Sequence, residues 1–230
     1  MVANGVTTFE IFGEEVAVSS ASIKGCRKSN EDSIGWLAKT RMGMYDSEPY
    51  LSITTDDEMF LAVVCDGVGG MKNGDRASRM IVEGSMEWAR TTDLIGLDDM
   101  CHNFKDFLSD LEKKMIEALP GSATTFVALL GTHEGWRSLH LGDSRCYAIG
   151  KDGYRFRTKD HSLVEKMFTY GLIEENRMNS HPQNNIITNY IGGNHVDCMQ
   201  INNLEPWSIA ILSSDGAHTA YDRKTFEELI

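Results

Sequence analysis

The sequence lacks the features expected of a membrane-spanning, nucleic-acid-binding or secreted protein. No apolar run approaches the roughly 18 residues that a membrane-spanning helix needs. The formal net charge is −12, so the chain has no excess of the positive charge that nucleic acids and anionic membranes attract. The segment Met1–Glu15 has neither a basic start nor an apolar core, so we expect no signal peptide.

Cysteine and proline are also scarce. The five cysteines are an odd number without close metal-ligand spacing, so we expect free thiols in a reducing cytoplasm and no zinc site. There are only four prolines, and the chain contains no Pro-rich linker, repeat or low-complexity tract. A length of 230 residues, of which 41% are hydrophobic, then predicts a single domain over residues 1–230.

The most informative stretch is Asp66-Gly67-Val68-Gly69-Gly70, which directly follows the apolar run Phe60–Cys65. An apolar run this short predicts a buried strand. A carboxylate followed by three glycines in four residues suits a backbone that comes close to an ion or a phosphate. An acidic loop with a tight turn is the alternative interpretation.

Other acidic residues occupy similar places. Asp215 follows an apolar strand pattern, Asp143 lies in Leu-Gly-Asp-Ser-Arg, and Glu31 and Asp32 follow a short polar segment. Carboxylates, carbonyls and water are the ligands that hard cations such as Mg²⁺ and Mn²⁺ prefer. We therefore expect a cluster of acidic strand ends that holds two or more such ions.

Hydrophobic periodicity predicts an α+β domain in which strands form hairpins and helices pair separately. We expect a surface loop over Lys39–Asp57 and a polar segment over Gly171–Gln183. The predicted strands cover Val16–Ile23, Ser33–Leu37, Phe60–Cys65, Ala123–Leu130, Ser138–Leu141, Arg145–Ile149, Tyr154–Arg157, Val196–Ile201 and Trp207–Ser213. The predicted helices cover Asn73–Thr91, Asp98–Leu119, His161–Tyr170 and Asp222–Ile230.

Seven motifs in order resemble the metal-dependent (type 2C) Ser/Thr protein phosphatases, most closely the bacterial stand-alone form. They are Arg-x-x-Asn-Glu-Asp, Asp-Gly-x-Gly-Gly, Gly-Ser-Ala-Thr-Thr, Leu-Gly-Asp-Ser-Arg, Asp-His-Ser, His-Pro-Gln-x-Asn and Ser-Asp-Gly. The resemblance runs from about Val16 to the C-terminus. It implies a four-layer α-β-β-α sandwich, with two antiparallel sheets flanked by helices and a metal cleft at one edge of the sheets.

The resemblance also implies metal ligands. Asp66 would bridge two cations, the Gly67 carbonyl would bind the second of them, and Asp215 would bind the first. Two bridged cations can make a shared water acidic enough to attack phosphorus at neutral pH.

Three further carboxylates complete the expected metal set. Asp143 matches the ligand of a third, weaker metal, and a turn-capping role is its alternative. Glu31 and Asp32 match the pair that holds waters of the second metal, and for Asp32 an Asx-turn is the alternative.

Arg27 and two histidines complete the implied site. Arg27 matches the residue that binds phosphate with two parallel donors, and a solvated surface arginine is its alternative. His161 and His181 lie in family-like segments and are candidates for protonating the leaving oxygen, although a lone histidine is more often structural.

The implied activity is hydrolysis of phosphoserine and phosphothreonine on proteins by a metal-activated water, with Mn²⁺ or Mg²⁺ as cofactor. We expect a cytoplasmic monomer that acts on targets of a Ser/Thr kinase and binds neither nucleic acid nor membrane. The family's last strand, which opens with Asp-Asn, has no counterpart in this sequence. Either the polypeptide is a truncated version or the first metal has lost a ligand, and a lost ligand would favour a non-catalytic regulatory module with an incomplete metal site. The Lys39–Asp57 loop and the Gly171–Gln183 segment leave a second alternative, a hydrolase of another phosphoryl modification on proteins.

Overall fold

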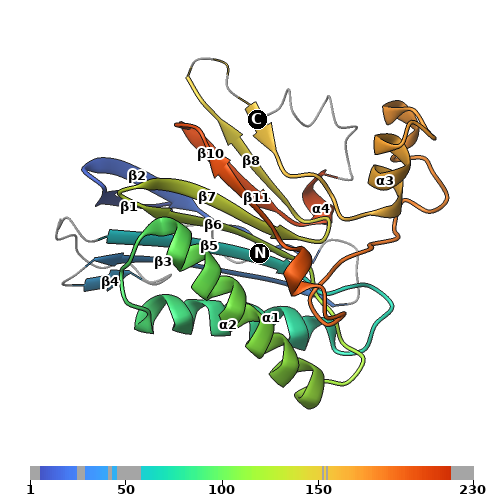
Figure 1. Ribbon diagram of the computed structural model, residues 1–230, viewed down its shortest axis with the longest axis horizontal. Coiled ribbons are helices and arrows are strands. Elements are labelled where there is room, and N and C mark those ends of the chain that lie inside the picture. The colour runs from blue at the N-terminus through green and yellow to red at the C-terminus, as the bar shows by residue number, and fades with distance from the viewer. Residues whose placement is uncertain are drawn as a thin grey trace.

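The structure, a computed structural model, describes residues 6–24, 29–40, 43–45, 58–151, 153 and 155–218. Several expectations above lie outside these ranges, namely the phosphate contact of Arg27, the free thiol of Cys26, most of the loop over Lys39–Asp57 and the helix over Asp222–Ile230. Of the helices described, none is both long and apolar enough to cross a bilayer. Figure 1 shows the helices and strands in their layers.

Six strands form the larger sheet. They are β3 (Asp32–Thr40), β4 (Gly43–Tyr45), β5 (Glu58–Asp66), β6 (Phe126–Thr132), β7 (Gly135–Leu141) and β10 (Gln200–Leu204). All neighbours pair antiparallel, in the order β10-β7-β6-β5-β3-β4. The pairing of β3 with β5 begins with Asp32 opposite Asp66, so these two residues lie at the same edge of the sheet.

Two long helices, α1 (Gly74–Thr91) and α2 (Leu97–Ala118), cover one face of this sheet (Figure 1). On β5, Met59, Leu61 and Val63 are buried in the core that the sheet shares with these helices. The alternate residues Phe60 and Val64 are buried in a second core on the opposite face. Successive side chains of a strand point to opposite faces, so a strand buried on both faces has the continuous apolar sequence seen here.

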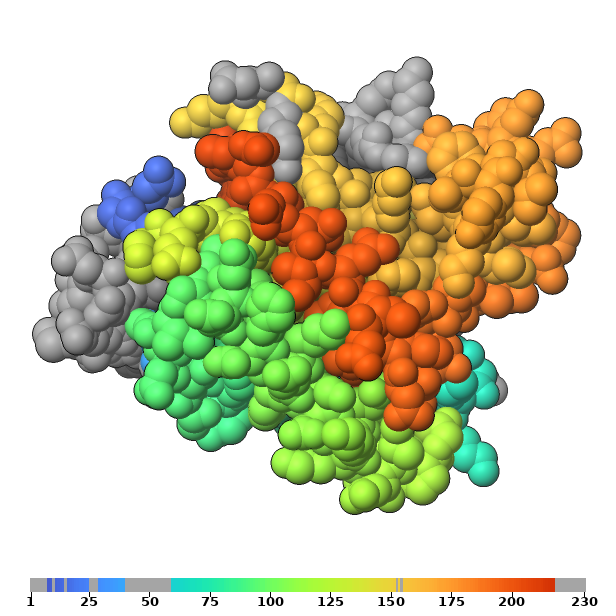
Figure 2. Space-filling view, in the orientation of Figure 1, coloured from blue at the N-terminus to red at the C-terminus, as the bar shows by residue number. Residues whose placement is uncertain are grey.

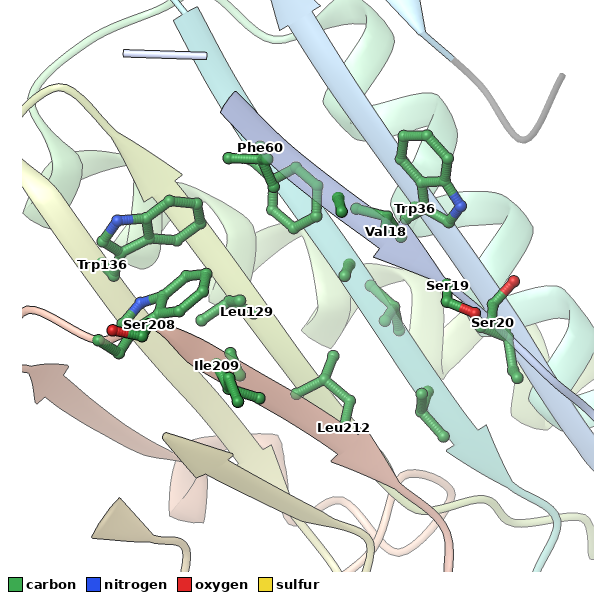
Figure 3. A pocket seen from close by; sticks show the side chains of 18 of the residues that line it. Val18, Ser19, Ser20, Trp36, Phe60, Leu129, Trp136, Ser208, Ile209 and Leu212 are labelled. Carbon is green, nitrogen blue, oxygen red and sulfur yellow. The ribbon is translucent and has the colours of Figure 1, made fainter. Parts of the chain in front are cut away.

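The second core is closed by a smaller sheet and a hairpin. Strands β8 (Arg145–Ile149), β9 (Arg155–Arg157) and β11 (Ile209–Ser213) pair antiparallel in the order β11-β8-β9, and β1 (Val6–Ile11) pairs with β2 (Glu14–Ser19). A cavity of about 890 Å³ lies between these strands and the larger sheet. Figure 3 shows its apolar lining, which includes Phe60, Trp136 and Leu212.

The connection from β9 to β10 forms a projecting segment with little regular structure. It contains helix α3 (Leu163–Thr169) and two 3₁₀ turns, Glu175–Arg177 and Val196–Cys198. Ser162 caps α3, because its Oγ accepts the N–H of Glu165. Figure 2 shows the orange part of this segment at one end of the molecule, away from α1 and α2.

Most of the predicted elements are confirmed, including the α+β class with antiparallel sheets and helices on the larger sheet. Three predictions were wrong in part. The expected surface loop over Lys39–Asp57 contains the end of β3 and the short strand β4. The strand expected over Val196–Ile201 begins at Gln200, after a 3₁₀ turn. The N-terminal strand β1 was not predicted, because its Val-Thr-Thr-Phe-Glu-Ile sequence is short and half polar.

Candidate active site

A polar cleft of about 370 Å³ lies where strands from both sheets end. Asp66 at the end of β5, Asp143 in the turn before β8, and Asp215 at the start of helix α4 (Asp215–His218) all line it, together with Gly67. The larger apolar cavity shares no lining residue with this cleft. The structure therefore brings together four of the residues that were predicted as metal ligands.

The carboxylates of this cleft strongly influence each other's ionisation. Burial, the charges of Asp215 and Asp32, and the more distant Asp143 raise the pKa of Asp66 to about 9. Burial, Asp160 and Asp215 raise the pKa of Asp143 to about 7. For both groups burial is the largest cause, and the neighbouring carboxylates add to it.

The side chains that line the cleft suit a hard divalent cation rather than a soft one. Asp66, Asp143 and Asp215 offer carboxylate oxygens, which are ligands that Mg²⁺ and Mn²⁺ prefer. A bound cation would offset the unfavourable electrostatic free energy that arises when these carboxylates repel each other. Within the described residues, however, no group of three or more His, Cys, Asp or Glu side chains has the close arrangement of a preformed metal site.

Two adjacent threonines hold the backbone of Asp66. The N–H of Asp66 donates to Thr125 Oγ1 at 2.9 Å, and the Asp66 carbonyl accepts from the Thr125 N–H at 2.8 Å and from Thr124 Oγ1 at 2.9 Å. Both threonines are buried. The Gly-Ser-Ala-Thr-Thr motif thus fixes the end of β5, a function that the sequence analysis did not assign to it.

Gly67 is needed for packing, in addition to any ligand role of its carbonyl. A Cβ atom at Gly67 would lie 2.5 Å from the carbonyl carbon of Gly74, at the start of α1. The Gly67 N–H also donates to the carbonyl of Glu31 at 3.1 Å. The turn after Asp66 is therefore packed between the start of α1 and the segment that leads into β3.

The acidic pair that precedes β3 lies beside this turn. The carbonyl of Glu31 also accepts from Ser78 Oγ on α1 at 2.6 Å. Asp32 N–H reaches Asn30 Oδ1 at 3.3 Å, an Asx-type contact, and Asp32 also raises the pKa of Asp66. In this contact Asn30 supplies the side-chain acceptor and Asp32 only its backbone N–H, so the Asx-type turn belongs to Asn30, and the Asp32 carboxylate is the group that acts on Asp66.

Sequence reasoning missed an ion pair that forms part of the cleft wall. Arg145 binds Asp160 through Nε at 2.8 Å and Nη2 at 2.6 Å, and Arg157 Nη1 lies 3.4 Å from the same carboxylate. Both Arg145 and Asp160 line the cleft, with side chains 12% and 8% exposed. Arg145 and Asp160 belong to the Leu-Gly-Asp-Ser-Arg and Asp-His-Ser motifs, but only the tertiary structure shows that they pair with each other.

The geometry argues against His161 as a proton donor. Its Nδ1 accepts the N–H of Gly142 at 3.0 Å, and its Nε2 lies 3.1 Å from the side-chain amide of Gln200. The ring is 8% exposed and stacks on His140, and burial lowers the pKa of His161. With both ring nitrogens engaged, His161 is best explained as a structural residue that holds the turn before Asp143.

His181 lies in the segment beside the cleft. Its Nδ1 accepts the N–H of Gln183 at 3.2 Å, which leaves Nε2 as the protonated nitrogen of the neutral ring. The neighbouring residues Asn179, Asn184 and Asn185 line the cleft itself. This segment therefore lines the cleft with three asparagines beside Met178 and Ile187.

Among the described cysteines, Cys65, Cys101 and Cys146 are buried, Cys198 is exposed, and all four are free thiols. The predicted absence of a disulfide framework is confirmed for these four. Cys26 lies outside the described residues.

Comparison with known proteins identifies the family to which this chain belongs. The family model described as protein phosphatase 2C matches residues 48–230. The chain belongs to the protein phosphatase 2C family. The matched region includes Asp66, Asp143 and Asp215, whereas Glu31 and Asp32 precede it.

Two curated relatives are similar over part of their length. A serine/threonine phosphatase stp of Listeria innocua is 31% identical over 143 residues, which cover 59% of this chain and 57% of the relative. The protein phosphatase PhpP of Streptococcus pneumoniae is 32% identical over 139 residues, which cover 57% and 56%. The matched region thus spans little more than half of each relative.

A solved structure supports the fold. The serine/threonine phosphatase Stp1 of Staphylococcus aureus superposes with a TM-score of 0.73 at 23% identity, covering 98% of this chain and 80% of that protein. At 23% identity this structural similarity supports the architecture of the chain alone.

Proposed function

We propose that the chain hydrolyses phosphoserine and phosphothreonine on proteins in a reaction that depends on divalent cations, Mn²⁺ or Mg²⁺. The observation that supports this most strongly is the convergence of Asp66, Asp143 and Asp215 in one cleft, with the pKa values of Asp66 and Asp143 raised. Family membership and the names of the relatives agree with the proposal.

The residues that would hold two cations, with a third weaker one, are Asp66, Asp215, Asp143, Asp32 and Glu31, together with the Gly67 carbonyl. When bound, such cations would supply Lewis-acid activation of water and neutralise charge on the phosphoryl group. Asp66 is held for this task by its backbone bonds to Thr124 and Thr125.

The chain's other residues would bind and orient the substrate. Arg27 would donate two parallel hydrogen bonds to phosphate oxygens. His181, in its doubly protonated imidazolium form, would donate a proton from Nε2 to the leaving serine or threonine oxygen and return to the neutral ring. Asn179, Asn184 and Asn185 would contact the peptide backbone of the substrate through their amides, which accept and donate equally well.

We infer further that the substrates are phosphoproteins produced by a Ser/Thr kinase and that the protein acts as a cytoplasmic monomer in signalling. Four free thiols support a reducing compartment. The net charge of −12 supports the absence of nucleic acid and anionic membrane among the partners.

Phosphate release from a phosphothreonine peptide tests this function. We expect release in the presence of Mn²⁺, its loss on addition of EDTA, and its return when excess Mn²⁺ is restored. Release that EDTA leaves unchanged would contradict the metal dependence. Binding of Mn²⁺ and phosphopeptide without any release would favour the non-catalytic module instead.

A further inference from the structure

Thr125 contacts both backbone segments that carry the cleft's most perturbed carboxylates. Its Oγ1 accepts the N–H of Asp66 at 2.9 Å and lies 2.6 Å from Ser144 Oγ. Ser144 directly follows Asp143 in sequence. One hydroxyl therefore joins the end of β5 in the larger sheet to the turn that leads into β8 in the smaller sheet.

The space around Thr125 leaves little freedom for this turn. A Cβ atom at Gly142 would lie 2.7 Å from the Cβ of Thr125. The Gly142 N–H donates to His161 Nδ1 at 3.0 Å, which holds the other side of the turn. Thr125 and Ser144 are 1% and 0% exposed, so no water competes for these hydrogen bonds.

We propose that Thr125 is a positioning residue that sets the separation of Asp66 and Asp143 across the two sheets, so that carboxylates from separate strands act as one cation-binding cluster. The inference rests on the function proposed above. Two carboxylates that repel each other need a fixed backbone if they are to stay close before a cation binds. The hydroxyl of Thr125 supplies that link at a buried point.

The matched variants are Thr125→Val, Thr125→Ser and Thr132→Val. Valine keeps the shape of threonine and removes the hydroxyl, whereas serine keeps the hydroxyl. Thr132 lies at the opposite end of β6, is also buried, and its Oγ1 accepts the backbone N–H of Glu134 at 3.2 Å. Thr132→Val therefore removes the same kind of hydrogen bond at the far end of β6, away from the cleft.

The primary measurement is Mn²⁺ affinity by calorimetric titration of each folded variant. We expect Thr125→Val to weaken Mn²⁺ binding by about tenfold or more. A change of this size corresponds to the net free energy of one buried hydrogen bond. Thr125→Ser and Thr132→Val should retain the wild-type affinity. Unchanged affinity in Thr125→Val, or an equal loss in Thr132→Val, would overturn the proposal.

Amide hydrogen exchange in the metal-free protein separates this inference from the proposed function. We expect Thr125→Val to speed exchange at Gly142 as well as at Asp66, although the Gly142 N–H bonds to His161 and not to Thr125. Thr132→Val should change neither amide. If the wild-type protein binds no Mn²⁺, the proposed function fails. The exchange rate at Gly142 still shows whether Thr125 connects the end of β5 to the turn before β8. Exchange that changes at Asp66 alone would reduce Thr125 to a local hydrogen bond and contradict the link.

Discussion

Asp32 and Asp66 lie directly opposite each other as partners at the end of the β3–β5 pairing. Like charges in this relationship destabilise a sheet, and burial together with Asp215 and Asp32 raises the pKa of Asp66 to about 9. The sheet therefore carries unfavourable electrostatic energy at one edge. A cation bound at this edge would relieve that repulsion, which is the physical basis for the cation site proposed here.

Substitution of Asp66 by Asn should stabilise the metal-free protein at neutral and alkaline pH. The carboxyl resists ionisation up to about pH 9 in the folded protein but ionises near pH 4 in the unfolded chain. The free energy of unfolding therefore falls as the pH rises through this window. In EDTA at pH 7 we expect Asp66→Asn to be more stable by on the order of 3 kcal/mol, measured by urea unfolding.

The control for that experiment is Asp106→Asn, which changes an exposed carboxylate on α2. Its stability relative to the wild type should not vary between pH 5 and pH 8. For Asp66→Asn the same difference in free energy of unfolding should grow between pH 5 and pH 8. If it stays constant, the carboxylates do not repel each other as described.

Loss of Asp160 should be costly, because the buried Arg145 guanidinium depends on it and Arg157, which also pairs with Glu165, lies beside it. Arg145 binds this carboxylate with two hydrogen bonds and Arg157 lies 3.4 Å away, all with side chains no more than 12% exposed. Removing one partner of a buried ion pair leaves an unpaired charge and costs about 3–5 kcal/mol. We expect a loss of this size for Asp160→Asn in urea unfolding. Asp110→Asn, which breaks the exposed pair with Lys113, should have no measurable effect, and equal losses in the two variants would refute the argument.

His140 should make the protein sensitive to acid. It is fully buried, neither ring nitrogen has a hydrogen-bond partner, and burial together with the neighbouring His161 lowers its pKa to about 3. Below about pH 6.5 the unfolded chain binds a proton that the folded protein excludes, so stability is lost as the pH falls.

The test substitution is His140→Phe, which keeps a ring beside His161 and cannot be protonated. Between pH 7 and pH 5 its stability relative to the wild type should rise by about 2 kcal/mol. The exposed His102 on α2 provides the matched control as His102→Gln. A constant difference between His140→Phe and the wild type at both pH values would mean that His140 becomes protonated in the folded state.

A side chain at Gly67 should disrupt the turn after Asp66. The added Cβ would meet the Gly74 backbone at 2.5 Å, whereas a Cβ at Gly69 would meet nothing within 4 Å. Gly67→Ala should therefore destabilise the protein by about 1–3 kcal/mol, as overpacked sites do, and Gly69→Ala should be close to neutral. Thermal unfolding of the two variants compares them directly, and similar melting temperatures would show that the turn can move without cost.

Much of the site was predictable because its residues occupy recognisable local positions. Asp66 and Asp215 each follow an apolar strand pattern, so their convergence at strand ends follows from simple periodicity. The roles of Thr125 and Asp160 were not predictable, because each pairs with residues from other strands and no local pattern marks such a contact. For His161 the sequence indicated its place near the cleft but not the Gly142 and Gln200 contacts that occupy its ring.

In the fold, too, elements with a local sequence pattern were predictable and elements that depend on tertiary pairing were not. The long helices were predicted within a few residues, because an apolar stripe of 3.6-residue period is a strong local signal. The short strand β4 was not, because three residues carry no period and its structure depends on pairing with β3.

Mn²⁺-dependent phosphate release by wild type and Asp66→Asn tests the central claim most directly. Both proteins, with Asp106→Asn as control, would be assayed on the same phosphothreonine peptide after circular dichroism confirms that they are folded. The proposed metal centre predicts release by the wild type and the control and its loss in Asp66→Asn, because an amide cannot replace a carboxylate shared by two cations. Undiminished release by a folded Asp66→Asn protein would contradict the account.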